Sequence, residues 1–124
     1  MMTKAQPVVL SIDDDQFVRE SLANFLEDFG FAVLQARDGE EGLEVFAAQR
    51  PDMVLVDLRM PRMDGLQVLA RVREIAPETP IMVVSGAGDI RDVVEALRRG
   101  AWDYLIKPIQ DMNILLHSVQ SCLD

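Results

Sequence analysis

Short apolar runs alternate with longer segments of helical period along this chain. The runs are rich in β-branched residues, and several are continuous, which is the pattern of strands buried on both faces of a parallel sheet. Five runs predict strands: Val8–Ile12, Ala32–Ala36, Met53–Val56, Ile81–Val84 and Tyr104–Ile106. The segment after each run is long enough for a helix, as the crossover between parallel strands requires.

The segments after the runs carry apolar residues at intervals of three and four, the spacing of an amphipathic helix. In the clearest of them, Ile90, Val93, Val94 and Leu97 fall at i, i+3, i+4 and i+7, and Gly100 follows as a stop signal. Aspartates that can cap a helix N-terminus precede the helical segments. They are Asp15, Asp38, Asp64, Asp89 and Asp111. We therefore predict an α/β fold of (βα)5 type, an open parallel sheet with helices on both faces.

Polar side chains stand at the ends of four predicted strands. Asp13 and Asp14 follow the first run, Asp57 the third, Ser85 the fourth and Lys107 the fifth. Ligands of an open α/β sheet bind outside the carboxyl ends of its strands, so we expect these side chains to share one crevice. Neighbouring carboxylates repel each other unless a cation neutralises them, and hard oxygen ligands with room for water suit Mg²⁺. The sequence thus predicts a magnesium site.

Asp57 is the predicted centre of the chemistry. A carboxylate can attack an activated phosphoryl donor and form an acyl phosphate, and catalysis then consists mainly of positioning and of neutralising negative charge. Mg²⁺, the Lys107 ammonium and the Ser85 hydroxyl would each serve one phosphoryl oxygen, and Gly86 leaves space for the group. This set of residues predicts an aspartate that is phosphorylated to transmit a signal.

Over essentially its whole length the chain resembles the response-regulator receiver domain of bacterial two-component signalling. The matching segments are Ile12–Asp15, Asp57–Gly65, Ser85–Ala87 and Lys107–Pro108. The resemblance implies a flavodoxin-like fold with strand order 2-1-3-4-5. It implies one receiver domain over residues 1–124, alone or as the N-terminal piece of a longer regulator. It also implies phosphorylation by a histidine kinase or phosphotransfer protein, without turnover of a separate substrate.

The resemblance assigns roles around the phosphoacceptor. Asp57 accepts the phosphoryl group, Asp14 binds Mg²⁺ directly, and Asp13 binds it through water. The backbone carbonyl of Arg59 supplies another ligand. The Arg59 side chain either shields the acyl phosphate from water or points to solvent.

A switch and a partner surface follow from the same resemblance. Ser85 is the switch hydroxyl, and Tyr104 matches the aromatic residue that swings inward; ordinary core packing is the alternative for Tyr104. The Lys107–Pro108 peptide bond is expected to be cis. Phosphorylation should change the face formed by the fourth helix, last strand and fifth helix, which would bind an output domain, a partner or a second copy. Surface positions on this face are Arg91, Glu95, Arg98, Arg99, Trp102 and Gln110.

A narrower resemblance concerns the C-terminal part of the chain. The segments Lys107–Asn113 and Ser118–Leu123 are similar to the receiver of the RssB-type adaptor, which delivers the stationary-phase sigma factor to a protease. The alternative function is therefore an interaction module that works without phosphorylation.

Charge and composition limit the other classes of function. The net charge of −9 argues against direct nucleic-acid binding, because contacts to phosphates need a basic face. The single cysteine, Cys122, excludes an internal disulfide and is expected to be a small apolar residue. No apolar run approaches the length of a membrane span, so we expect a cytoplasmic protein.

Three other classes of function compete with the receiver interpretation. A phosphatase of the haloacid dehalogenase type needs a second aspartate two residues after the nucleophile, where this chain has Arg59. A flavodoxin-like electron carrier would cradle a phosphate after the first strand, where Asp13–Asp15 would repel it. An interaction module with a vestigial pocket is disfavoured because every pocket residue type is present.

Two further residues have simple expected environments. His117 lies opposite the apolar stripe of the last helix and should be exposed, neither a ligand nor a phosphocarrier. Trp102 should pack before the last strand or belong to a partner surface.

Overall fold

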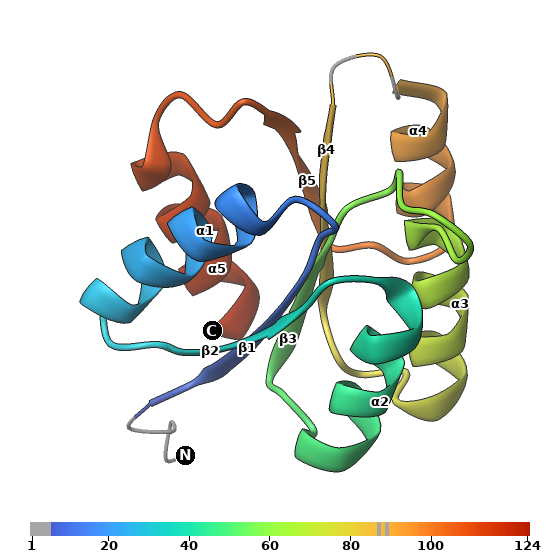
Figure 1. Ribbon diagram of the computed structural model, residues 1–124, viewed down its shortest axis with the longest axis horizontal. Helices are drawn as coiled ribbons and strands as arrows, with labels where there is room; N and C mark the ends of the chain where they lie inside the picture. The colour runs from blue at the N-terminus through green and yellow to red at the C-terminus, as the bar shows by residue number, and fades with distance from the viewer. Residues whose placement is uncertain (1–5, 87, 89) are drawn as a thin grey trace.

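The computed structural model of the chain describes residues 6–86, 88 and 90–124 (Figure 1). Its sheet contains five strands: β1 (Val8–Ile12), β2 (Ala32–Ala36), β3 (Met53–Val56), β4 (Ile81–Gly86) and β5 (Asp103–Lys107). The strand order is β2-β1-β3-β4-β5, and every neighbouring pair is parallel. The predicted (βα)5 fold and its strand order 2-1-3-4-5 are therefore confirmed.

One helix follows each strand, as the periodicity predicts. The helices are α1 (Gln16–Asp28), α2 (Gly39–Gln49), α3 (Gly65–Ile75), α4 (Ile90–Arg98) and α5 (Met112–Leu123). One face of the sheet is covered by α1 and α5, and the other by α2, α3 and α4 (Figure 1). Within the part of the chain that the structure describes, no helix is both long and apolar enough to cross a membrane.

The sheet separates two hydrophobic cores, because successive side chains of a strand point to opposite faces. In β1, Val9 packs with residues of α1 and α5, whereas Leu10 packs with residues of α2, α3 and α4. In β3, Leu55 packs on the side of α1 and α5, and Val54 packs on the side of α2, α3 and α4. The side chains of Val9, Leu10, Val54 and Leu55 are all buried. The continuous apolar runs thus reflect burial on both faces, as predicted.

Strands β4 and β5 extend beyond the apolar runs that predict them. Ser85 lies opposite Ile106, and Gly86 lies opposite Lys107, in the parallel register of these two strands. The pairing continues here because ladder hydrogen bonds join backbone groups, whatever the polarity of the side chains. Ser85 and Lys107 are consequently held inside strands rather than in the loops that follow.

Four helices begin at the aspartates expected from the sequence. The side-chain acceptors and the backbone N–H groups that donate to them are Asp15 and Val18 (3.3 Å), Asp38 and Glu41 (2.8 Å), Asp64 and Gln67 (2.9 Å), and Asp111 and Asn113 (3.0 Å). The residue expected to cap α4, Asp89, lies outside the described residues. The positions of the caps explain why the helices begin where the sequence predicts.

Loss of the α3 cap should have a moderate, local cost. Asp64 and Gln67 form a reciprocal capping box, in which Gln67 Oε1 accepts from the Asp64 backbone N–H at 2.9 Å. Asp64→Ala should lower the free energy of unfolding by about 1 kcal/mol, measured by urea denaturation. Asp64→Ser, which keeps a capping acceptor, should retain most of the stability; equal losses in both variants would contradict the capping explanation.

Candidate functional site

The polar strand ends meet at the carboxyl edge of the sheet. Asp13 and Asp57 directly follow the neighbouring strands β1 and β3 and continue their backbone pairing. The Asp57 N–H donates to the Ile12 carbonyl at 3.0 Å, and the Asp13 N–H donates to the Ala36 carbonyl at 3.1 Å. The strand order reverses at β1, and open α/β sheets bind their ligands at such a point.

Three carboxylates gather at this edge. One oxygen from each of Asp13, Asp14 and Asp57 lies within 4.8 Å of the other two. Asp13 and Asp57 are buried, whereas Asp14 is exposed and faces solvent. Hard oxygen donors that are partly open to water match the preference of Mg²⁺ for a few carboxylates and several retained waters. The residues present therefore fit a divalent cation of this kind.

Lys107 joins two of these carboxylates. Its Nζ donates to Asp13 Oδ2 at 3.1 Å and to Asp57 Oδ2 at 3.2 Å, and the Lys107 side chain is only 21% exposed. Burial lowers the pKa of the Lys107 ammonium, but the hydrogen bonds and negative charges of Asp13 and Asp57 outweigh burial and raise the pKa overall. A permanent positive charge thus stands beside Asp57.

The pKa of the Asp57 carboxyl is raised despite this ion pair. Burial and the neighbouring Asp13 charge raise the pKa of Asp57 from 3.8 to about 6, against the opposing effects of Lys107 and of the Arg59 N–H. One ammonium therefore does not compensate the clustered carboxylates. A bound cation would supply the missing positive charge.

The turn that carries Asp13 is fixed by contacts that the sequence does not reveal. The Asp15 N–H donates to Asp13 Oδ1 at 2.9 Å, and the Arg19 guanidinium in α1 donates to the Asp13 carbonyl at 2.6 Å. Sequence reasoning missed Arg19, because an arginine in the first turns of an amphipathic helix usually indicates only a solvated face. Here Arg19 ties the start of α1 to the acidic turn.

Gly65 lets α3 approach the segment that follows β3. Its N–H donates to the Leu58 carbonyl at 3.0 Å. A Cβ atom at this position would lie 2.4 Å from the Asp57 carbonyl oxygen and 2.8 Å from the Leu58 Cα. Only glycine permits this contact without a shift of the backbone. The sequence motif contains Gly65, but this packing requirement emerges only from the structure.

The sequence profile of the response regulator receiver domain matches residues 9–120. The chain belongs to this family.

Individual relatives agree with the family match. The Regulator of RpoS of Escherichia coli (strain K12) is 36% identical over 115 residues, which are 93% of this chain and 34% of that protein. Response regulator MprA of Mycolicibacterium vanbaalenii is 43% identical over 100 residues, which are 81% of this chain and 43% of that protein. The crystal structure of the NtrX receiver domain from Brucella abortus matches with a TM-score of 0.89 at 32% identity, covering 93% of this chain and 97% of that one.

The family match and these relatives agree with both resemblances noted in the sequence. The resemblance to receiver domains and the narrower one to the RssB-type adaptor are confirmed. This receiver domain spans only 34% and 43% of the two curated relatives. The activities and partners of those whole proteins are therefore not established for this chain.

The two predicted switch residues of the receiver domain lie on neighbouring strands. Ser85 is fully buried in β4, and Tyr104 is 37% exposed in β5. Tyr104 lies opposite Val83, two residues before Ser85, so both side chains emerge on the sheet face covered by α2, α3 and α4. The switch role stays a prediction.

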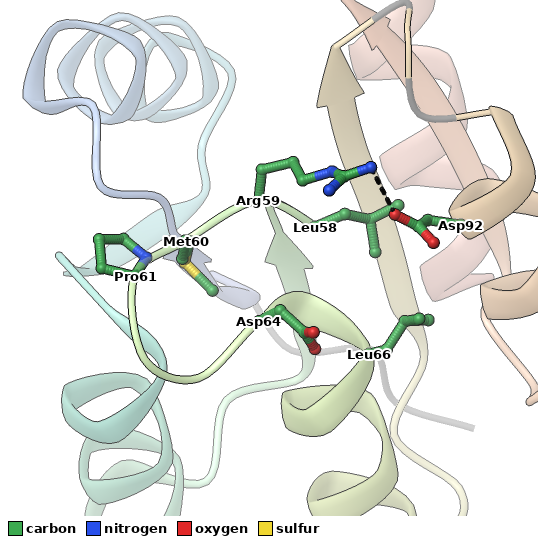
Figure 2. A pocket seen from close by; sticks show the side chains of 7 residues that line it. All are labelled: Leu58, Arg59, Met60, Pro61, Asp64, Leu66 and Asp92. Atoms are coloured by element: carbon green, nitrogen blue, oxygen red, sulfur yellow. Dashed lines mark ion pairs between the residues drawn. The ribbon is translucent and has the colours of Figure 1, made fainter.

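Arg59 has a side-chain partner that the sequence did not suggest. Its backbone N–H donates to Asp57 Oδ1 at 3.3 Å, which places its main chain at the edge of the carboxylate cluster. Its guanidinium forms an ion pair with Asp92 of α4 at 3.0 Å (Figure 2). The side chain thus reaches across to α4, rather than simply pointing to solvent.

The remaining predictions have mixed outcomes. The Lys107–Pro108 bond is cis and His117 is exposed, as expected. Burial and the Asp103 charge raise the pKa of the half-buried Cys122 thiol to about 11, which keeps it neutral at physiological pH. Trp102 is 55% exposed, so the expected packing before β5 is wrong, and its place in a partner surface stays a prediction.

Proposed function

We propose that this receiver domain accepts a phosphoryl group on Asp57 from a histidine kinase or phosphotransfer protein, in a reaction that requires Mg²⁺. The observation that carries the proposal is the Lys107 ammonium, which lies 3.1 Å from Asp13 and 3.2 Å from Asp57 inside the three-carboxylate cluster. A structural ion pair would need one carboxylate, whereas phosphoryl transfer needs a nucleophile, a fixed cation and ligands for a metal.

The chemistry is a displacement at phosphorus. A carboxylate oxygen of Asp57 forms a bond to phosphorus as the bond from phosphorus to the donor breaks, and the donor leaves with that electron pair. Mg²⁺ held by Asp13, Asp14, Asp57 and the Arg59 carbonyl would supply positive charge to the phosphoryl oxygens. Lys107 supplies a second positive charge.

The proposal describes a switch rather than an enzyme with its own substrate. A phosphatase built on an aspartyl nucleophile needs a general acid two residues later, and Arg59 cannot act as one. We place this activity in the cytoplasm. The face formed by α4, β5 and α5 would bind an output domain, a partner protein or, after phosphorylation, a second copy of the chain.

The mass of the intact protein tests the phosphoacceptor. Wild-type protein incubated with acetyl phosphate and Mg²⁺ should gain one phosphoryl group, and the gain should disappear when Mg²⁺ is omitted. Asp57→Asn should show no gain, whereas Asp52→Asn, which changes an aspartate just before β3, should be phosphorylated like wild type. An unmodified wild-type protein, or a phosphorylated Asp57→Asn variant, would refute the proposal.

Ser85 should couple the phosphoryl group to the partner face. Trp102 is the only tryptophan and lies 55% exposed just before β5, so its fluorescence can report on this face. Phosphorylation should change the emission of wild-type protein, and Ser85→Ala should abolish most of the change even when its mass shows phosphorylation. The exposed Ser121→Ala serves as the control. An unchanged response in Ser85→Ala would contradict coupling through this hydroxyl.

A second candidate function is adaptor activity toward the stationary-phase sigma factor. The identity of 36% with the Regulator of RpoS over 93% of this chain supports it. Titration calorimetry with that sigma factor, using wild-type and Asp57→Asn protein, separates the two functions. Equal, tight binding by both proteins would favour the adaptor, and absence of binding would eliminate it.

A further inference from the structure

The Arg59 side chain bridges the segment after β3 and the first turn of α4. One end of the bridge is the segment after β3, anchored by the hydrogen bond from the Arg59 N–H to Asp57 Oδ1. The other end is Asp92 in the first turn of α4, which pairs with the guanidinium at 3.0 Å (Figure 2). The phosphoacceptor and α4 are therefore connected through one residue.

Two depressions border the Arg59–Asp92 ion pair. Arg59 and Asp92 line a depression of about 390 Å³ together with five residues of the segment after β3 and the start of α3: Leu58, Met60, Pro61, Asp64 and Leu66 (Figure 2). The same pair lines a second depression of about 240 Å³ with Gly88, Ile90 and Arg91. Between the β3–α3 segment and the start of α4, the ion pair thus spans a gap that side chains do not fill.

Helix α4, which carries Asp92, buries few apolar side chains. Val93 and Ala96 are the buried residues of α4. On the same helix Ile90 is 56% exposed and Val94 is 45% exposed. Elements with little buried apolar surface open and shift at low cost. A single ion pair at the first turn can therefore influence the position of this helix.

We propose that Arg59 and Asp92 form a latch that holds α4 while Asp57 is unphosphorylated and opens when Asp57 is phosphorylated. The inference rests on the proposed phosphorylation of Asp57. The acyl phosphate carries roughly two negative charges near neutral pH in place of the single charge of the Asp57 carboxylate, and guanidinium groups bind phosphate oxygens with paired hydrogen bonds. The Arg59–Asp92 pair is exposed and therefore weak, so the new charge beside the Arg59 main chain competes with Asp92 for the guanidinium.

This route differs from the switch through Ser85 and Tyr104. Those residues lie on β4 and β5, whereas the latch runs from the segment after β3 directly to the first turn of α4. The two routes reach the same partner face from different sides. Substitution of Asp92, which lies outside the carboxylate cluster, should therefore reduce the response of α4 without preventing phosphorylation.

Hydrogen exchange of the α4 amides tests the latch. Exchange is measured by mass spectrometry on wild-type protein before and after treatment with acetyl phosphate and Mg²⁺, with the extent of phosphorylation followed by intact mass. Phosphorylation should speed α4 exchange in wild type by about two- to fivefold, the equilibrium factor for loss of an exposed ion pair. Asp92→Asn and Arg59→Gln should start near the faster rate and respond much less.

The Glu95–Arg99 ion pair provides a matched control. It joins Glu95 of α4 to Arg99, the residue directly after the helix, at 2.7 Å, and does not reach the segment after β3. Glu95→Gln should change basal exchange but keep the full response to phosphorylation, and the Arg59→Gln, Asp92→Asn double variant should resemble either single variant.

Three outcomes would overturn the latch. The first is a full response in phosphorylated Asp92→Asn, and the second is an equal loss of response in Glu95→Gln. The third is phosphorylated wild type with unchanged α4 exchange, which would leave the proposed function standing. A wild-type mass without a phosphoryl group would instead refute the proposed function, and the latch with it.

Discussion

Asp57→Asn is expected to stabilise the metal-free domain by about 3 kcal/mol near pH 7.5, although it removes the proposed phosphoacceptor. The reason is the environment of this carboxyl, whose pKa is raised by burial and by Asp13 from 3.8 to about 6. In the unfolded chain the same carboxyl ionises in water without that cost. An amide keeps the shape without a buried charge, and retains one of the two oxygens that accept hydrogen bonds from the Arg59 N–H and from Lys107 Nζ.

The effect has a defined pH dependence. The folded carboxyl binds its proton more tightly than the unfolded one, so its ionisation opposes folding. The penalty is absent well below the unfolded value of 3.8, grows as pH rises towards about 6, and is complete above that value. The stability advantage of Asp57→Asn should therefore fall to about 0.5 kcal/mol at pH 4 and vanish near pH 3.

Urea denaturation across this pH range, with chelator present, measures the effect. Asp14→Asn is the matched control, because Asp14 belongs to the same cluster but is exposed. The gain in the free energy of unfolding of Asp14→Asn should therefore be much smaller than that of Asp57→Asn. Adding Mg²⁺ should stabilise wild type more than Asp57→Asn. Metal-free Asp57→Asn that is no more stable than wild type at pH 7.5 would show that the carboxyl carries no such penalty.

Gly65→Ala should cost about 3 kcal/mol of stability and also impair phosphorylation. The added Cβ would meet the Asp57 carbonyl oxygen at 2.4 Å, and the backbone of either α3 or the segment after β3 must move. Because Asp57 itself belongs to that segment, its carboxylate should be displaced from Lys107.

Gly88→Ala is the control for this prediction, since no described atom beyond its chain neighbours lies within 4 Å of a Cβ added there. Urea denaturation gives the stability, and intact mass after acetyl phosphate treatment gives the extent of phosphorylation. If Gly65→Ala retained the stability and the phosphorylation of Gly88→Ala, the close packing of α3 on Asp57 would not matter.

The sequence was a good guide to the elements of the fold for a physical reason. Runs such as Met53–Val56 are buried on both faces, and aspartates such as Asp38 cap their helices locally, so short-range patterns carry this information. The limits of β4 and β5 were less predictable. Strand pairing extends to Ser85 and Lys107 through backbone hydrogen bonds, which do not depend on the polarity of the side chains.

The candidate site likewise has parts that the sequence predicts and parts that it does not. The placement of Asp13, Asp57 and Lys107 together follows from parallel strands ending at one edge. The contact of Arg19 with the Asp13 carbonyl and the reach of Arg59 to α4 depend on long side chains crossing between elements. Such contacts leave no periodic pattern in the sequence. The strand order, too, is predicted from the family resemblance rather than from the hydrophobic pattern.

The division of the interior into two cores has a consequence for how this domain can change over time. Side chains of the α1–α5 layer and of the α2–α3–α4 layer are separated by a sheet of backbone, so substitutions in one layer should combine additively with those in the other. Leu26 and Val68 belong to opposite layers and make a suitable pair for such a test. A lineage could therefore remodel one side of the molecule for a new partner while inheriting the other side intact.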